Sequence, residues 1–246
     1  MRLLVLAEWF KLKHDSRFKI IALTCLLLEG ILIQGNYIQK TDMLLQEAPN
    51  GYVGSSTSFW QIALLAAISF FCASDFITGA IRNPISIGQT RVGIYLSRLI
   101  AAMIMTAALL GLLALAGGIA MFFINGTGSE SLWAGILAWG IALGKQIVLH
   151  LAYPAAFLMI AFITRSPAMS LLISFLFIIA LMLAPYAVSI LFPDLFPLFV
   201  QALPDSHIQR LGTENESFIY GLAVCGGWFG VTSIVGCALF ARTDIK

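Results

Sequence analysis

Four long stretches without any Asp, Glu, Lys or Arg constrain this chain more than any other feature of its sequence. They cover residues 48–74, 99–129, 166–193 and 217–241. The hydrocarbon core of a bilayer is about 30 Å thick and takes about 20 residues of helix, so each stretch can hold a span. A membrane β-barrel would instead alternate apolar and polar residues over strands of about 10 residues. The sequence therefore predicts an all-α integral membrane protein with a single domain over residues 1–246.

The composition excludes other classes of protein. Hydrophobic residues make up 60% of the chain and charged residues 11%, whereas soluble domains have about 25% charged residues. The formal net charge of +2 is small and scattered, so we expect no nucleic-acid partner. All four cysteines lie in apolar runs, where they act as small hydrophobic residues.

Six transmembrane helices account for the apolar pattern. The fourth predicted span is longer than a bilayer requires and contains Pro154, which removes a backbone donor, so we expect a tilted or broken helix there. The predicted spans cover residues 18–37, 59–81, 99–124, 133–163, 167–192 and 217–241.

The basic residues predict the orientation, because cytoplasmic loops retain Lys and Arg. With the amino terminus inside, only Lys40 and Arg210 fall outside, and Lys145 lies within a span. We therefore expect both termini in the cytoplasm. The basic residues on the inner side are then Arg2, Lys11, Lys13, Arg17, Lys19, Arg82, Arg91, Arg98, Arg165, Arg242 and Lys246.

Three segments outside the spans also suggest structure. Residues 1–17 place Leu3, Leu6 and Phe10 on one side of a helix and Glu8, Lys11 and Asp15 on the other, which predicts an interfacial helix rather than an undocked basic tail. Residues 83–95 suit a short helix at the cytoplasmic face, with a plain connecting loop as the alternative. Residues 193–216 hold apolar pieces too short to span, separated by prolines, which predicts outer re-entrant helices.

Motifs for catalysis are missing from the sequence. The only Gly-Lys pair, Gly144-Lys145, lies in a span and is not a phosphate loop. There is no His-Glu-x-x-His or Cys-x-x-Cys motif, and the three histidines fall in different topological compartments. We therefore expect neither catalytic residues nor a metal site, and no nucleotide hydrolysis by this chain.

A few ionisable side chains remain at membrane depth, where each would cost about 2.5–3.5 kcal/mol if it faced lipid. Glu29 could contact a cationic or amphipathic substrate, or pair internally with Lys145. Lys145 could also extend to the outer boundary, and His150 could be a packing residue or a proton relay. Asp75 could cap or pair near Gly79 and Arg82, or be a plain interfacial acid.

The stretch over residues 75–84, continued over 91–99, resembles the permease subunit of ABC-2-type exporters. In that family an acidic residue ends span two, a Gly step follows, and a Ser/Thr-Arg pair precedes an Ile-Tyr/Leu-x-x-Lys entry to span three. Arg98 replaces the usual Lys here. In its small size the chain most resembles the permeases of bacterial antimicrobial-peptide immunity, bacitracin resistance and cytolytic-peptide export. The matching positions in this chain are Asp75, Gly79, Thr90-Arg91, Ile94-Tyr95 and Arg98.

The resemblance implies an ATP-driven exporter of amphipathic peptides, drugs or lipids in the plasma membrane of a bacterium. It implies two ATP-binding subunits that hold ATP and Mg²⁺, a second permease, identical or related, and a surrounding of membrane lipids. Glu29, Lys145 and His150 would then lie on the substrate path. An ion- or proton-coupled secondary transporter is the main alternative, and a membrane-embedded enzyme or assembly subunit is another. Residues 83–95 would form the coupling helix that contacts the ATPase. The residues that would couple the chain to the ATPase are Arg82, Asn83, Ser86, Arg91 and Tyr95.

Overall fold

The computed structural model describes residues 2–39, 57–125, 132–209 and 218–242, and no strand occurs within these ranges. Among these residues, five helical segments are long and apolar enough to cross a membrane. They confirm an all-α, multi-pass membrane protein. The five segments are α5 (Thr57–Ile77), α7 (Arg91–Asn125), the α8 and α9 pair (Leu132–His150 and Ala152–Thr164), α10 (Pro167–Leu191) and α13 (Phe218–Arg242).

The first predicted span corresponds to α2 (Ser16–Gln39), which follows α1 (Arg2–His14) after a break at Asp15. The side chains of residues 32–39 lie outside the described part, so the structure confirms the helix and its crossing of the membrane stays a prediction. The predicted break in the fourth span is confirmed: α8 ends at His150 and α9 begins at Ala152. Pro154 has no amide hydrogen for the carbonyl of His150, which interrupts the ladder of helical hydrogen bonds.

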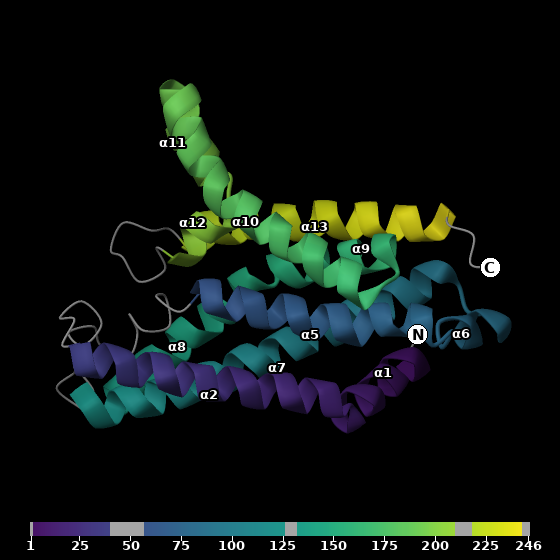
Figure 1. Cartoon of the computed structure of the whole chain (residues 1–246), viewed down its shortest axis with the longest axis horizontal. Helices are drawn as coiled ribbons and strands as arrows, with labels where there is room; N and C mark the ends of the chain where they lie inside the picture. Colours follow the sequence, from purple (N-terminus) through teal and green to yellow (C-terminus); the bar gives the residue numbers. More distant parts are fainter. Residues whose placement is uncertain (1, 40–56, 126–131, 210–217, 243–246) are drawn as a thin grey trace.

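The short helix α9 lies at the centre of the bundle, where it packs against α5, α13 and α10. Ten of its thirteen residues are buried. Figure 1 shows α1, α6 and the last turn of α13 at one end of the bundle, which we call the α6 end, and α12 at the opposite α12 end. The guanidinium of Arg91 links the start of α7 to the last turn of α13 by donating to the carbonyl of Ala241 at 3.1 Å. Which compartment the α6 end faces stays a prediction.

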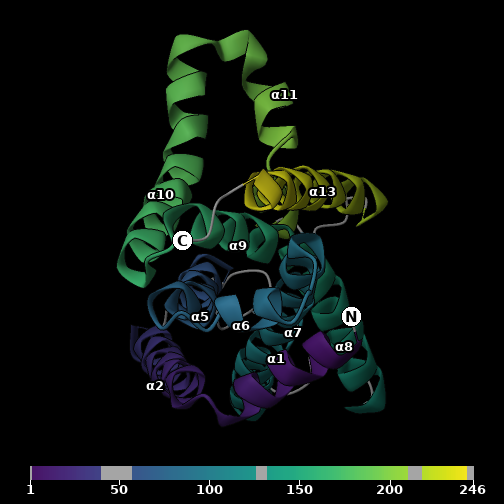
Figure 2. The same cartoon turned by 90° about the vertical axis from the view of Figure 1, so that its right-hand side faces the viewer.

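Helix α10 departs from the bundle (Figure 2). Its buried residues, Ser170, Ser174 and Ile178, all lie in its first half, and Pro185 lies in the half that extends outward. Three short helices lead from its far end back to α13: η1 (Pro193–Leu195), α11 (Phe196–Gln201) and α12 (Pro204–Gln209). The sequence predicts such short, proline-bounded helices, because proline is favoured in a first helical turn. Their insertion into the outer leaflet is untested.

The helix in the predicted coupling segment is shorter than residues 83–95, since α6 covers only Arg82–Ser86. Gly88, at φ 83°, adopts the left-handed conformation that commonly terminates helices, and its amide donates to the carbonyl of Ile85 at 3.0 Å. Helix α7 then begins at Arg91, and the hydroxyl of Thr90 caps it by accepting from the amide of Gly93 at 3.1 Å.

Candidate functional site

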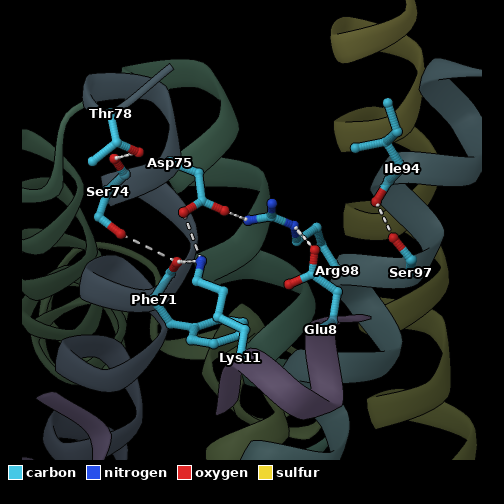
Figure 3. A network of polar contacts seen from close by, with 9 residues as sticks. All are labelled: Glu8, Lys11, Phe71, Ser74, Asp75, Thr78, Ile94, Ser97 and Arg98. Atoms are coloured by element: carbon cyan, nitrogen blue, oxygen red, sulfur yellow. Dashed lines mark hydrogen bonds and ion pairs between the residues drawn. The ribbon is translucent and has the colours of Figure 1, made fainter. Parts of the chain in front are cut away.

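Four charged side chains from three helices meet at the α6 end, and we call them the ion cluster (Figure 3). Glu8 and Lys11 come from α1, Asp75 from α5 and Arg98 from α7. The Nζ atom of Lys11 lies 2.6 Å from Oδ1 of Asp75, and Nε of Arg98 lies 2.6 Å from Oε1 of Glu8. Nη1 of Arg98 also pairs with the second carboxylate oxygen of Asp75. The Asp75–Arg98 pair therefore joins α5 to α7. Helix α1 is attached to α5 through Lys11 and to α7 through Glu8.

The contacts of the Lys11 side chain hold it against α5. Its Nζ atom also donates to the carbonyl of Phe71 at 3.0 Å and lies 4.3 Å from the centre of the Phe71 ring. The ring contact adds a cation–π attraction to the ion pair. Lys11 is 31% exposed at its side chain, whereas Asp75 and Arg98 are 7% and 5% exposed. Most of the cluster is therefore withdrawn from solvent, where ion pairs are strong only if each charge has a partner.

Burial raises the pKa of Glu8, and the charges of Arg98 and Lys11 lower it to a lesser extent. The net direction is upward from the ordinary value of 4.5. The cluster contains two acidic and two basic side chains, so its formal charges cancel within the chain. Such an arrangement suits a structural joint between helices better than a site that awaits an ion.

Helix α1 turns its charged side toward the protein. Glu8 and Lys11 face α5 and α7, while Leu6, Trp9 and Phe10 are exposed. The sequence predicts the separation of apolar and charged sides but does not indicate which side packs on the bundle. An exposed apolar side suits a helix that lies against lipid at the membrane interface.

The predicted coupling residues divide into two groups. Arg82, Asn83 and Ser86 are exposed on α6. Arg91 is half-buried at the start of α7, and Tyr95 is fully buried, with its ring 5.1 Å from that of Phe162. Their roles in coupling stay predictions, and any role of Tyr95 would act through the residues around it.

Tyr95 is packed closely against α13 at Gly236. A Cβ atom at position 236 would overlap the Tyr95 ring, so only glycine allows this approach of α13 to α7. The contact lies one helical turn from Arg98 and helps to keep α7 fixed beside the ion cluster.

The three residues predicted on the substrate path come from two helices, Glu29 from α2 and both Lys145 and His150 from α8. Glu29 is buried on the side of α2 that also buries Ala22 and Cys25. Lys145 is exposed, with Nζ 5.6 Å from the centre of the Phe218 ring, and it does not pair with Glu29, because the ion pairs between described residues are confined to the ion cluster. His150 is fully buried and its Nδ1 lies 2.8 Å from the carbonyl oxygen of Gln146, as expected for a packing residue. Contact with cargo is untested for all three.

A second carboxylate, which sequence reasoning missed, collects polar partners at the α12 end. Oδ1 of Asp205 accepts from the side-chain amide of Gln61 at 2.7 Å and from the hydroxyl of Tyr153 at 3.3 Å. Oδ2 accepts from the side-chain amide of Gln209 at 2.6 Å. Gln61 and Tyr153 are buried in α5 and α9, so Asp205 holds α12 against the bundle.

No family model matches the sequence, and no curated protein is similar enough to match it. The structure itself shows an all-helical protein with five helical segments of membrane length among its described residues. The features that bear on function are therefore the arrangement of α6, the ion cluster and the partners of Asp205.

Proposed function

We propose that the chain is the transmembrane permease subunit of an ATP-driven exporter, which moves amphipathic peptides, drugs or lipids out of the cell. Two ATP-binding subunits, which hold ATP and Mg²⁺, dock at the α6 end, and a second copy of the chain or a related permease completes the pathway. In this proposal the α6 end faces the cytoplasm, as the distribution of Lys and Arg predicts.

The observation that carries the proposal is the link between exposed α6 and the ion cluster. Helix α6 lies between α5 and α7 in the chain, and Asp75 and Arg98 pair these two helices directly. Both residues belong to the short pattern by which the sequence resembles ABC-2-type permeases. A displacement of α6 by a docked ATPase would therefore move α5 and α7 together, and α1 would follow through Glu8 and Lys11.

The exposed surface of α6 supports a docking role. Arg82, Asn83 and Ser86 point away from the core, and none of the residues of α6 is buried. A helix that leaves its polar side chains exposed while its neighbours are fixed by buried ion pairs can receive a partner without refolding.

The test is co-purification of the permease with an ATP-binding subunit encoded beside it. Ser86→Trp places a bulky ring on exposed α6, and we expect it to abolish co-purification and stimulated ATPase activity while the chain still inserts and unfolds at the parental temperature. The expected loss of subunit affinity is at least about tenfold.

Ser189→Trp is the matched control at the far side of the molecule. Ser189 is half-buried on α10, and its hydroxyl donates to the carbonyl three residues earlier, as that of Ser86 does, both at 2.8 Å. We expect Ser189→Trp to retain the ATPase subunit. Full retention by Ser86→Trp, or equal loss in both variants, would show that α6 is not the docking element.

A further inference from the structure

A cleft of about 450 Å³ opens at the α12 end, between the extended half of α10 and the short helices α11 and α12. Its walls are mostly apolar and include Met182, Pro185 and Tyr186 from α10 and Phe196 from α11. Asp205 contributes a carboxylate to the same cleft. This size, with an apolar lining and few polar groups, is typical of sites for small molecules.

The partners of Asp205 stabilise its carboxylate without neutralising it. Two are amides, from Gln61 and Gln209, and one is the hydroxyl of Tyr153, so none carries a charge. Within the described ranges, ion pairs occur only in the ion cluster at the other end of the bundle. The negative charge of Asp205 is thus left for something that enters the cleft.

The hydroxyl of the adjacent Ser206 does not donate to this carboxylate. Ser206 donates within its own segment, to the carbonyls of Val200 and Leu203, both at 2.7 Å. These bonds fix the turn between α11 and α12 and keep Asp205 directed to Gln61 and the cleft.

We propose that this cleft binds a monovalent organic cation, an ammonium or guanidinium group attached to an apolar body. The N–H groups donate to Asp205 in charge-assisted hydrogen bonds, and the apolar body lies along α10 and α11. The rings of Tyr186 and Phe196 add favourable contacts with a cation. No basic residue lines the cleft among the described residues, so the phosphate of a zwitterionic lipid headgroup would lack a partner.

This proposal does not depend on the chain being an exporter, because binding is a property of the chain alone. The full chain is placed in phosphatidylcholine nanodiscs, and binding of 1-naphthylmethylammonium is measured by equilibrium dialysis with empty nanodiscs subtracted. We expect saturable binding of the ammonium. The neutral alcohol 1-naphthylmethanol and the anion 1-naphthylacetate should bind at least about tenfold more weakly.

Two variants measure the contribution of the carboxylate and of the cleft volume separately. Asp205→Asn should weaken ammonium binding at least about tenfold, and Met182→Trp, which fills the cleft, should abolish it. Asp194→Asn is the matched control, because Asp194 is an exposed acid of η1 that does not line the cleft, and it should bind as the parent does. Thermal unfolding verifies that each variant is folded.

Three results would overturn the proposal. One is equal binding by Asp205→Asn and the parent, and another is equal binding of the ammonium and the alcohol. The third concerns Arg210, which follows α12 in the sequence and lies outside the described residues. We expect Arg210→Gln to leave affinity unchanged within about twofold, and a tenfold gain would show that Asp205 already has an internal cation as its partner.

Discussion

Asp75 and Asp205 lie at opposite ends of the same bundle and are held in opposite ways. Asp75 pairs with two cations, Lys11 and Arg98, at a site that is almost closed to solvent. Asp205 is half-buried beside a cleft and, among the described residues, accepts only from neutral groups. Both carboxylates join helices that are far apart in the sequence, but only one of them has its charge balanced by the described residues.

This difference distinguishes a charge that holds helices together from a charge that can bind a ligand. A buried ion pair contributes little net stability, yet removing one member is costly because the other is left uncompensated. Neutral donors, in contrast, can be satisfied by water or by a different acceptor when the carboxylate changes. The ion cluster therefore has the properties of a fixed joint, and the surroundings of Asp205 have those of a site with room for a cation.

The largest effect is expected from Asp75→Asn. The substitution leaves Lys11 and the buried Arg98 with one carboxylate, Glu8, between them, which should destabilise the protein by about 3–5 kcal/mol. Thermal unfolding in detergent should show a midpoint lowered by about 10 °C. Asp194→Asn, at an exposed acid, should leave the midpoint unchanged. A midpoint within about 2 °C of the parent for Asp75→Asn would mean that the ion cluster does not hold the three helices.

Much of the fold follows from local sequence signals. The charge-free stretches locate the helices, because uninterrupted apolar runs of this length have few other solutions. Pro154 locates the break between α8 and α9, and the prolines after residue 192 locate the short helices that return to α13. The end of α6 is less predictable, since it depends on the left-handed conformation of Gly88 in a stretch that could have continued as helix.

The sites follow less directly, because a charged residue does not indicate its partner. Asp75 could have paired with Arg82 near the loop, but the structure pairs it with Lys11 and Arg98. One signal was available: Asp75 lies near the end of α5 and Arg98 lies about two turns into α7, and a single short segment joins these helices, which brings both residues to the same end of the bundle. The contacts of Asp205 had no such signal, since Gln61 and Tyr153 come from distant spans.

A smaller effect is expected from Glu8→Gln, which replaces the acid of the ion cluster whose pKa is raised. Burial raises the pKa of Glu8, so the folded state binds its proton more tightly than the unfolded state. The contribution of Glu8 to stability therefore becomes less favourable as pH rises above 4.5 and through the raised folded-state pKa. Glutamine resembles the protonated acid and does not titrate, so the stability of the variant relative to that of the parent should rise as pH increases toward neutral.

The measurement is the unfolding midpoint of both proteins across this pH range, with Asp194→Asn as the control. The midpoint of Glu8→Gln relative to the parent should rise with pH, and this change should stay well below the loss caused by Asp75→Asn. A variant that loses stability relative to the parent as pH rises would show that attraction to Arg98 and Lys11 outweighs burial at Glu8.

The smallest effect on stability is expected from Asp205→Asn, although it should have the largest effect on cation binding. The retained oxygen of asparagine can still accept from Gln61 and Tyr153. The new amide meets the amide of Gln209, but Gln209 is exposed and can turn its own oxygen toward it. The cost should be below about 1 kcal/mol, a change of at most a few degrees in the midpoint. If Asp205→Asn instead destabilises the protein as much as Asp75→Asn, then Asp205 has a cationic partner within the chain, and the contrast between the two ends of the bundle disappears.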